Sequence, residues 1–333
     1  MKKLPMSEQN LVTTYNIDAS FLSMAASHYK QTAPWIYGNF IQIKGFKGTS
    51  QNFFYESQHD RDTPFFSIQR ISREIIGRKW NNIIEFVIDC VDLDFYILLL
   101  VNNKYLSVSE AFGITDYYHD IFIYGYDLEK EVFYIAGNFT NGKYMRVTCS
   151  FCELNEAYIN LEDDFYDWLF GVVLYKYREN ESHKVDRDLW KRVKSLLKHY
   201  VECTHMSEND YAITTHYDRE NLLFGYDVYQ NTIEILVNNM TVNENIDIRP
   251  FHLFLDHKKI MQERFKYLNA NKYFDPSELD LVKIEKIVEM SEIHRNIAIK
   301  YNLTKDRSVL ERLINLMKQF INYEKEYYLK IIG

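Results

Sequence analysis

The sequence predicts an α+β fold, in which an antiparallel sheet with flanking helices is followed by a mainly helical C-terminal half. Three observations indicate this class: a β-hairpin pattern over residues 119–138, short apolar runs on either side of it, and helical periodicity from about residue 185 onwards. A chain of 333 residues is long enough for one large or two modest domains. We expect a sheet core over residues 1–180 and a helical region over 181–333 packed on that core.

The first third of the chain predicts one helix and two strands. Thr63 and Pro64 are typical of a helix start, Gly77 of a helix end, and the apolar residues between them recur at helical spacing: Phe65, Ile68, Ile71 and Ile75. Residues 83–90 and 95–101 are short apolar runs bounded by asparagines, which predicts two buried strands.

The clearest local pattern is the hairpin. Residues 119–126 predict one strand, 127–130 a tight turn and 131–136 the returning strand, followed by another strand near 143–148. Ser150 and Glu153 have capping-box spacing, so a helix should start there and continue to about Asn160.

The C-terminal half predicts long helices. One should start at residues 275–278, where an acidic cap precedes a proline, and continue to about Lys300. A last helix over 305–331 carries one apolar stripe, which is more typical of a core than of a cofactor site: Leu310, Leu313, Met317, Phe320 and Ile321.

Charge and composition exclude several classes of protein. The net charge of −8 argues against nucleic-acid or anionic-membrane binding. The longest apolar run, Phe95 to Val101, is far shorter than the ~20 residues of a membrane span, and the N-terminus lacks the pattern of a signal peptide. Four cysteines do not make a disulfide framework. We therefore expect a cytoplasmic protein.

The hairpin also predicts a pair of polar side chains. If the turn spans 127–130, Tyr126 faces Glu131, and the same register places His119 opposite Asn138. Opposed residues have Cβ atoms ~4.5–5.5 Å apart, within reach of an imidazole–amide hydrogen bond. A histidine oriented by an asparagine is the base half of a Cys-His-Asn site, although an edge histidine beside a turn-forming asparagine explains the same residues.

The run HDIFIYGYD, followed after a short turn by EVFYIAGN, resembles the histidine hairpin of bacterial papain-like proteins. It is similar to the butirosin biosynthesis protein H N-terminal family over roughly residues 30–175. The resemblance implies a papain-like sheet core and an acyl transfer in natural-product (antibiotic) biosynthesis, from a carrier-bound thioester through a cysteine to an amine. It also implies that His119 is the general base and Asn138 its orienter.

The nucleophile is the main departure from that family, whose cysteine precedes the hairpin at the start of a helix. The corresponding segment here, residues 34–42, has no cysteine, and the first one in the chain is Cys90. Three explanations remain open: Cys90 is a relocated nucleophile; a hydroxyl of Ser23, Ser27 or Thr32 replaces it; or the protein is a non-catalytic accessory factor that binds a synthetase or carrier protein.

Other chemistry has weaker support. Cys149 and Cys152 form a C-x-x-C pair, yet a zinc site needs two further ligands, for which Cys203 and His205 are distant candidates. The sequence has no phosphate-loop or dinucleotide motif, and we expect no cofactor. A group of basic residues predicts a cationic face for an acidic acyl or peptidyl carrier protein: Lys44, Lys47, Arg61, Arg70, Arg73, Arg78 and Lys79.

Overall fold

The computed structural model describes residues 1–55, 63–162, 165–178, 188–205, 221–274 and 279–333. The chain forms two compact units: unit 1 consists of residues 1–32 and 59–184, and unit 2 of residues 33–58 and 185–333. Residues 33–58, expected in the sheet core, belong to unit 2, because a strand in this segment pairs with a strand at residues 222–224.

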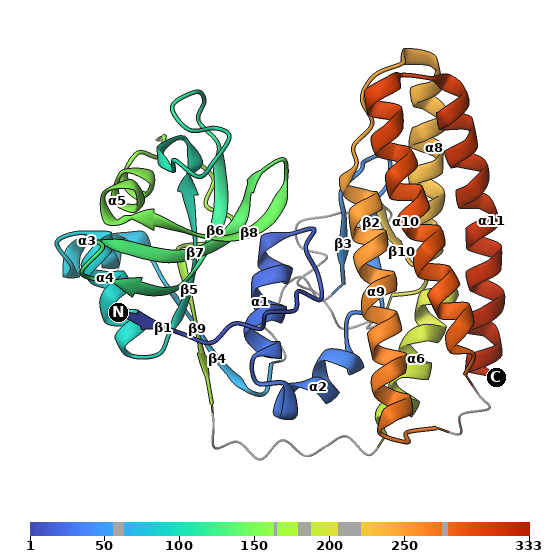
Figure 1. Ribbon diagram of the computed structural model, residues 1–333, viewed down its shortest axis with the longest axis horizontal. Coiled ribbons are helices and arrows are strands. Elements are labelled where there is room, and N and C mark those ends of the chain that lie inside the picture. Colours follow the sequence, from blue (N-terminus) through green and yellow to red (C-terminus); the bar gives the residue numbers. More distant parts are fainter. Residues whose placement is uncertain (56–62, 163–164, 179–187, 206–220, 275–278) are drawn as a thin grey trace. The chain divides into compact units, whose positions relative to one another are not determined.

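Unit 1 is built on a seven-stranded antiparallel sheet, shown in Figure 1. The central strand, β6, pairs with β5 and β7, and the short β1 continues the β5 side of β6. The antiparallel sheet and its flanking helices confirm the expected α+β class. In sheet order the strands are β4 (Phe66–Ile71), β9 (Val172–Tyr177), β5 (Tyr96–Asn102), β6 (Tyr118–Asp127), β7 (Val132–Thr140) and β8 (Lys143–Ser150), with β1 (Lys2–Lys3) beside β6.

Short helices pack against this sheet. α1 contacts β6 and β7, whereas α4 contacts β5 and β6, and α5 contacts β5 and β8. The capping box of α5 is confirmed, since Ser150 accepts from the Glu153 amide and Glu153 from the Ser150 amide. The helices are α1 (Asn16–Ala26), α2 (Tyr29–Gly38, which extends into unit 2), α3 (Arg73–Lys79), α4 (Ile83–Asp92) and α5 (Phe151–Ile159), with a 3₁₀ turn at Asn103–Tyr105.

Two local predictions in unit 1 are wrong. The segment expected to be a helix from Pro64 is β4 over its first part, because pairing with β9 overrides the helical spacing, and only α3 is helical. The run 83–90, expected to be a strand, belongs to α4. The Asn82 side chain caps the N-terminus of this helix. Its buried residues follow a helical period: Ile83, Phe86, Val87, Cys90 and Val91.

The hairpin of β6 and β7 is confirmed, but its register differs from the expected one. Tyr126 pairs with Phe133 rather than with Glu131, and Asp127 pairs with Val132. A β-bulge between Ile123 and Gly125 then shifts the pairing by one residue. Beyond the bulge, Ile123 pairs with Ile135 and Phe122 with Ala136, a register that does not place His119 opposite Asn138.

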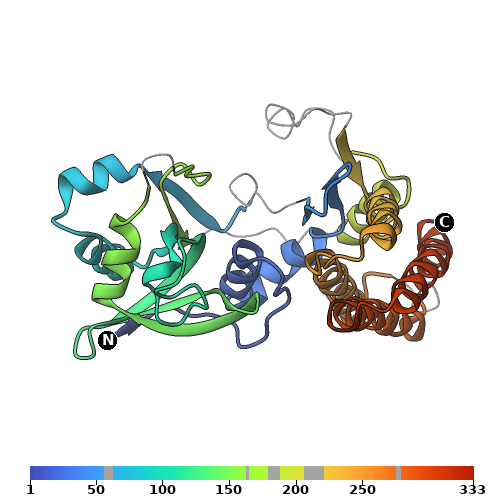
Figure 2. The ribbon, with the colours of Figure 1, turned by 90° about the horizontal axis from the view of Figure 1, so that it is seen from above.

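Unit 2 is mostly helical, as the sequence predicted. Figure 2 shows its helices from one end, with α11 contacting α6, α8 and α10, and α10 contacting α9. The start expected at 275–278 lies outside the described residues, and α10 is capped by Asp280. The elements are α6 (Leu189–Val201), α8 (Tyr226–Val242), α9 (Arg249–Ala270), α10 (Leu281–Thr304) and α11 (Arg307–Ile332), beside a sheet of β10 (Leu222–Phe224), β2 (Ile43–Phe46) and β3 (Asn52–Phe54).

The core of unit 2 contains a fully buried ion pair. The Lys258 ammonium on α9 lies 2.8 Å from Oε1 and 3.0 Å from Oε2 of Glu324 on α11, and both side chains are 0% exposed. The Tyr200 hydroxyl and the His257 Nδ1 each lie 2.8 Å from the same ammonium. Burial outweighs the attraction of Glu324 and lowers the Lys258 pKa to about 8.

Candidate functional site

His119 lies near the start of β6, where it pairs with Val101 of β5. Its Nδ1 atom is 3.2 Å from the Asp120 carboxylate and 3.1 Å from the Asp120 carbonyl oxygen. The His119 side chain is 28% exposed, whereas that of Asp120 is only 9% exposed. The imidazole therefore has a buried carboxylate to orient it and an edge that solvent reaches.

Asn138 does not orient this imidazole. It lies on β7 opposite Tyr144 of β8, and its amide donates to the Gly142 carbonyl oxygen at 2.7 Å and to the Thr13 carbonyl oxygen at 3.4 Å. Its own Oδ1 atom is buried without a hydrogen-bond partner. The side chain that lies against the His119 imidazole is instead that of Asp120, the next residue in the chain.

Cys90 is unsuited to be the nucleophile of this site. Burial, with a smaller contribution from neighbouring Asp89, raises the pKa of its thiol to about 12, so almost no thiolate forms at neutral pH. Cys90 also lies near the end of α4, where Asp92 accepts a hydrogen bond from the Tyr126 hydroxyl. Tyr126 is seven residues along β6 from His119, which corresponds to about 23 Å of extended strand.

The hydroxyls proposed as substitutes are engaged elsewhere. Ser23 donates to the Ser7 carbonyl oxygen, Ser27 to that of Met24, and the Thr32 hydroxyl to that of Ala25 at 2.7 Å. Within the residues that the structure describes, Asp120 is the only hydrogen-bonding partner of the His119 imidazole. Among the described residues, no cysteine thiol and none of these three hydroxyls hydrogen-bonds to the His119 imidazole.

The side-chain amide of the first residue of α1 contacts Asp120, the neighbour of His119. Asn16, the first residue of α1, donates to Asp120 Oδ2 at 2.6 Å and to the Asp120 carbonyl oxygen at 3.0 Å. The segment in which a cysteine was expected, residues 34–42, instead covers the end of α2 and the chain after it. The helix start beside the histidine is therefore that of α1, and it carries Asn16.

Asn16 begins a row of buried polar side chains on α1. Ser20 donates to Asn16 Oδ1 at 2.7 Å and lies 3.1 Å from the Tyr144 hydroxyl, and Ser23 accepts from Arg146 at 2.6 Å. These positions recur at helical spacing and face the sheet. This row was not predicted, although polar residues recur at helical spacing at 16, 20 and 23 in a helix whose other residues, apart from Asp18, are apolar.

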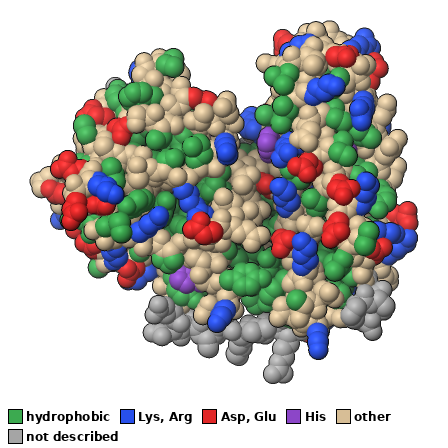
Figure 3. Space-filling model, in the orientation of Figure 1, with side chains coloured by type: hydrophobic (Ala, Val, Ile, Leu, Met, Phe, Trp, Pro, Cys, Tyr) green, Lys and Arg blue, Asp and Glu red, His purple; other side chains and the backbone are tan. Residues whose placement is uncertain are grey.

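The expected cationic face is divided. Lys44 belongs to unit 2, Arg61 lies outside the described residues, and Arg73 is held by Asp167 at 2.8 Å. Three of the basic residues remain exposed around α3 of unit 1: Arg70, Arg78 and Lys79. Elsewhere, on the face shown in Figure 3, basic and acidic side chains are interspersed over both units.

No metal centre emerges from the described part of the chain. It contains no cluster of three His, Cys, Asp or Glu side chains arranged to hold a metal ion. Of the C-x-x-C pair, Cys149 is buried on β8 and Cys152 is exposed on α5, while Cys203 and His205 belong to unit 2. Among the described helices, none combines the length and apolar character needed to span a bilayer.

Comparison of the chain with protein-family models finds no match, and a search of curated proteins finds none either.

Proposed function

We propose that this protein is a non-catalytic accessory factor of bacterial natural-product biosynthesis, which binds an acidic acyl or peptidyl carrier protein or its synthetase. The observation that carries the proposal is the combination at the start of α1: an imidazole beside a carboxylate, with the Asn16 amide rather than a thiol bound to that carboxylate. Acyl transfer through a covalent intermediate needs a nucleophile beside the base, and among the described residues no thiol or hydroxyl hydrogen-bonds to His119, which supports a binding role.

The exposed end of unit 1 around α3 suits a carrier protein. Arg78 and Lys79 end this helix, and both are exposed, although Arg78 shares its charge with Glu74 at 2.7 Å. Ile75, on the same helix, is 51% exposed. An apolar side chain within a cationic rim is what an acidic partner with an apolar contact would bind, and the charges would mainly accelerate association.

The test is a binding and turnover experiment with purified carrier proteins. We expect an acidic carrier protein to bind reversibly in biolayer interferometry, with an association rate that falls as salt rises. The double variant Arg78→Glu/Lys79→Glu should slow association about tenfold or more, whereas Lys130→Glu, which reverses an exposed lysine elsewhere in unit 1, should have a much smaller effect.

Turnover separates this proposal from its main alternative, an acyltransferase or thioesterase. The same carrier, loaded with an acyl thioester, should remain loaded in the presence of the protein when followed by intact-protein mass spectrometry. Binding should also survive His119→Ala. If the thioester is consumed by the wild type but not by His119→Ala, the protein is an enzyme, and if no carrier binds at all, the accessory function is wrong.

A further inference from the structure

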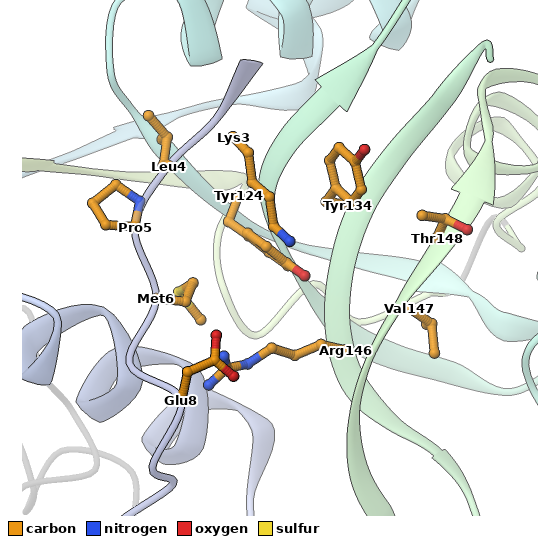
Figure 4. A pocket seen from close by; sticks show the side chains of 10 residues that line it. All are labelled: Lys3, Leu4, Pro5, Met6, Glu8, Tyr124, Tyr134, Arg146, Val147 and Thr148. Atoms are coloured by element: carbon orange, nitrogen blue, oxygen red, sulfur yellow. The ribbon is translucent and has the colours of Figure 1, made fainter. Parts of the chain in front are cut away.

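Unit 1 has a pocket that the His119 site does not use. It has a volume of about 610 Å³ and lies between the N-terminal segment and strands β6, β7 and β8, as Figure 4 shows. Lys3, Met6 and Glu8 line it from the N-terminal segment, and Tyr124 and Tyr134 from the sheet. This volume is within the ~300–1,000 Å³ typical of small-molecule sites.

The pocket has a positive charge without a carboxylate partner. The Lys3 ammonium lies 4.8 Å from the centre of the Tyr134 ring and 5.5 Å from that of Tyr124. Among the described residues, no carboxylate forms an ion pair with this ammonium. A cation held over aromatic faces stays close to them while its other side remains open to an anion.

Arg146 adds a second donor to the pocket. One of its terminal nitrogens bonds to Asn10 Oδ1 at 2.8 Å, to Ser23 Oγ at 2.6 Å and to the Ser7 carbonyl oxygen, which fixes the guanidinium in place. Its Nε atom is buried and has no hydrogen-bond partner. A buried donor without an acceptor destabilises the folded protein, so an acceptor arriving with a ligand would remove a penalty already present.

The lining also restricts the kind of anion. The pocket has an apolar wall formed by Leu4, Met6 and Val147, together with the ring faces of Tyr124 and Tyr134. Glu8 is the only acidic residue of the lining, so Lys3 and Arg146 leave one net positive charge. A fully hydrated inorganic ion would leave the apolar part unused, whereas an organic anion would fill both parts.

From the unpaired ammonium, the buried Nε donor and the apolar wall, we propose that this pocket binds a small organic anion, a carboxylate or phosphate monoester attached to an aliphatic or aromatic body. The acidic group contacts Lys3 and Arg146, and the body packs against Met6 and Tyr124. This site goes beyond the proposed carrier binding, since it requires neither a carrier protein nor His119.

The experiment titrates the whole protein with hexanoate and with hexyl phosphate, using isothermal titration calorimetry and tyrosine fluorescence at low salt. Hexylammonium, with the same chain and the opposite charge, is the ligand control. We expect saturable binding of at least one anion and none of hexylammonium. The choice between the two anions identifies the acidic group.

Lys3→Met tests the site itself, because it removes the charge and keeps an apolar side chain of similar length. We expect it to weaken binding of the anion about tenfold or more, whereas Lys130→Met, which neutralises an exposed lysine elsewhere in unit 1, leaves binding unchanged. Equal binding of hexylammonium, an unchanged affinity in Lys3→Met, or no saturable binding of either anion would overturn the proposal. None of these outcomes would alter the binding of a carrier protein at α3.

Discussion

Replacing Lys258 by methionine leaves Glu324 as an uncompensated charge in the core of unit 2. The structure shows how much is lost: the ammonium contacts both carboxylate oxygens at 2.8 and 3.0 Å, and the rings of Tyr200, Tyr229 and Phe320 surround it. Removing one partner of a buried pair costs about 3–5 kcal/mol. For a unit of this size, that corresponds to a fall in Tm of roughly 6–20 °C.

Urea titration followed by circular dichroism measures this loss, and Lys259→Met is the matched control. Lys259 is the next residue on α9 and is exposed, so its replacement should change the free energy of unfolding by less than about 0.5 kcal/mol. The double variant Lys258→Met/Glu324→Gln should recover part of the stability, because it leaves no buried charge.

The comparison of these variants decides whether the pair stabilises unit 2. If Lys258→Met is no less stable than Lys259→Met, the reasoning about the pair is refuted.

Three further predictions concern other parts of the chain. Iodoacetamide should label exposed Cys152 well before Cys90 in mass spectrometry at pH 8. Burial raises the Cys90 pKa from 9.0 to about 12, which lowers its thiolate fraction about a thousandfold; comparable rates at the two cysteines would contradict this. Burial lowers the pKa of His294 from 6.5 to about 4, so as the pH falls the unfolded state binds the proton before the folded state does. A contribution of about 3 kcal/mol to the free energy of unfolding, present above pH 6.5, should therefore be lost between pH 6.5 and 4. In urea titrations, His294→Gln should show a smaller loss over that range, and an equal loss would argue against this source. Gly225 has φ of 52°, and a Cβ there would lie 1.9 Å from a carbonyl oxygen. Gly113 has a similar φ of 66°, but no atom lies within 4 Å of a Cβ built on it. Gly225→Ala should therefore unfold unit 2 or lower its Tm far more than Gly113→Ala lowers the Tm of unit 1.

Local chemistry explains which elements could be predicted from the sequence. The α5 capping box needs only Ser150 and Glu153, and the hairpin needs only alternating apolar residues and a short turn, so both are confirmed. The run 83–90 could not be resolved in this way, because apolar β-branched residues suit a buried strand and a buried helix equally. The Asn82 cap decides between the two in the folded protein.

At the candidate site, the positions of Asn16 and Asn138 could not be predicted from the sequence, because they depend on contacts between residues that are distant in the chain. His119 was singled out from its hairpin, but the position of Asn16 depends on a contact across 104 residues of chain. The register of Asn138 depends on a bulge at Ile123/Gly125, where the backbone of Lys2 and Lys3 approaches within 3 Å of a Cβ built on the glycine. Neither the Asn16 contact nor the β-bulge can be recognised from a single sequence.

The pairing of β2 with β10 has a consequence for synthesis of the chain on the ribosome. Residues 43–46 emerge early, yet the strand that completes their sheet ends at residue 224. At ~5–20 residues per second, the backbone groups on that edge wait about 10–40 s for their partner, which is long enough for wrong pairing with a neighbouring chain. The order of segments therefore sets how long this strand edge stays unpaired, and slower translation would lengthen the exposure.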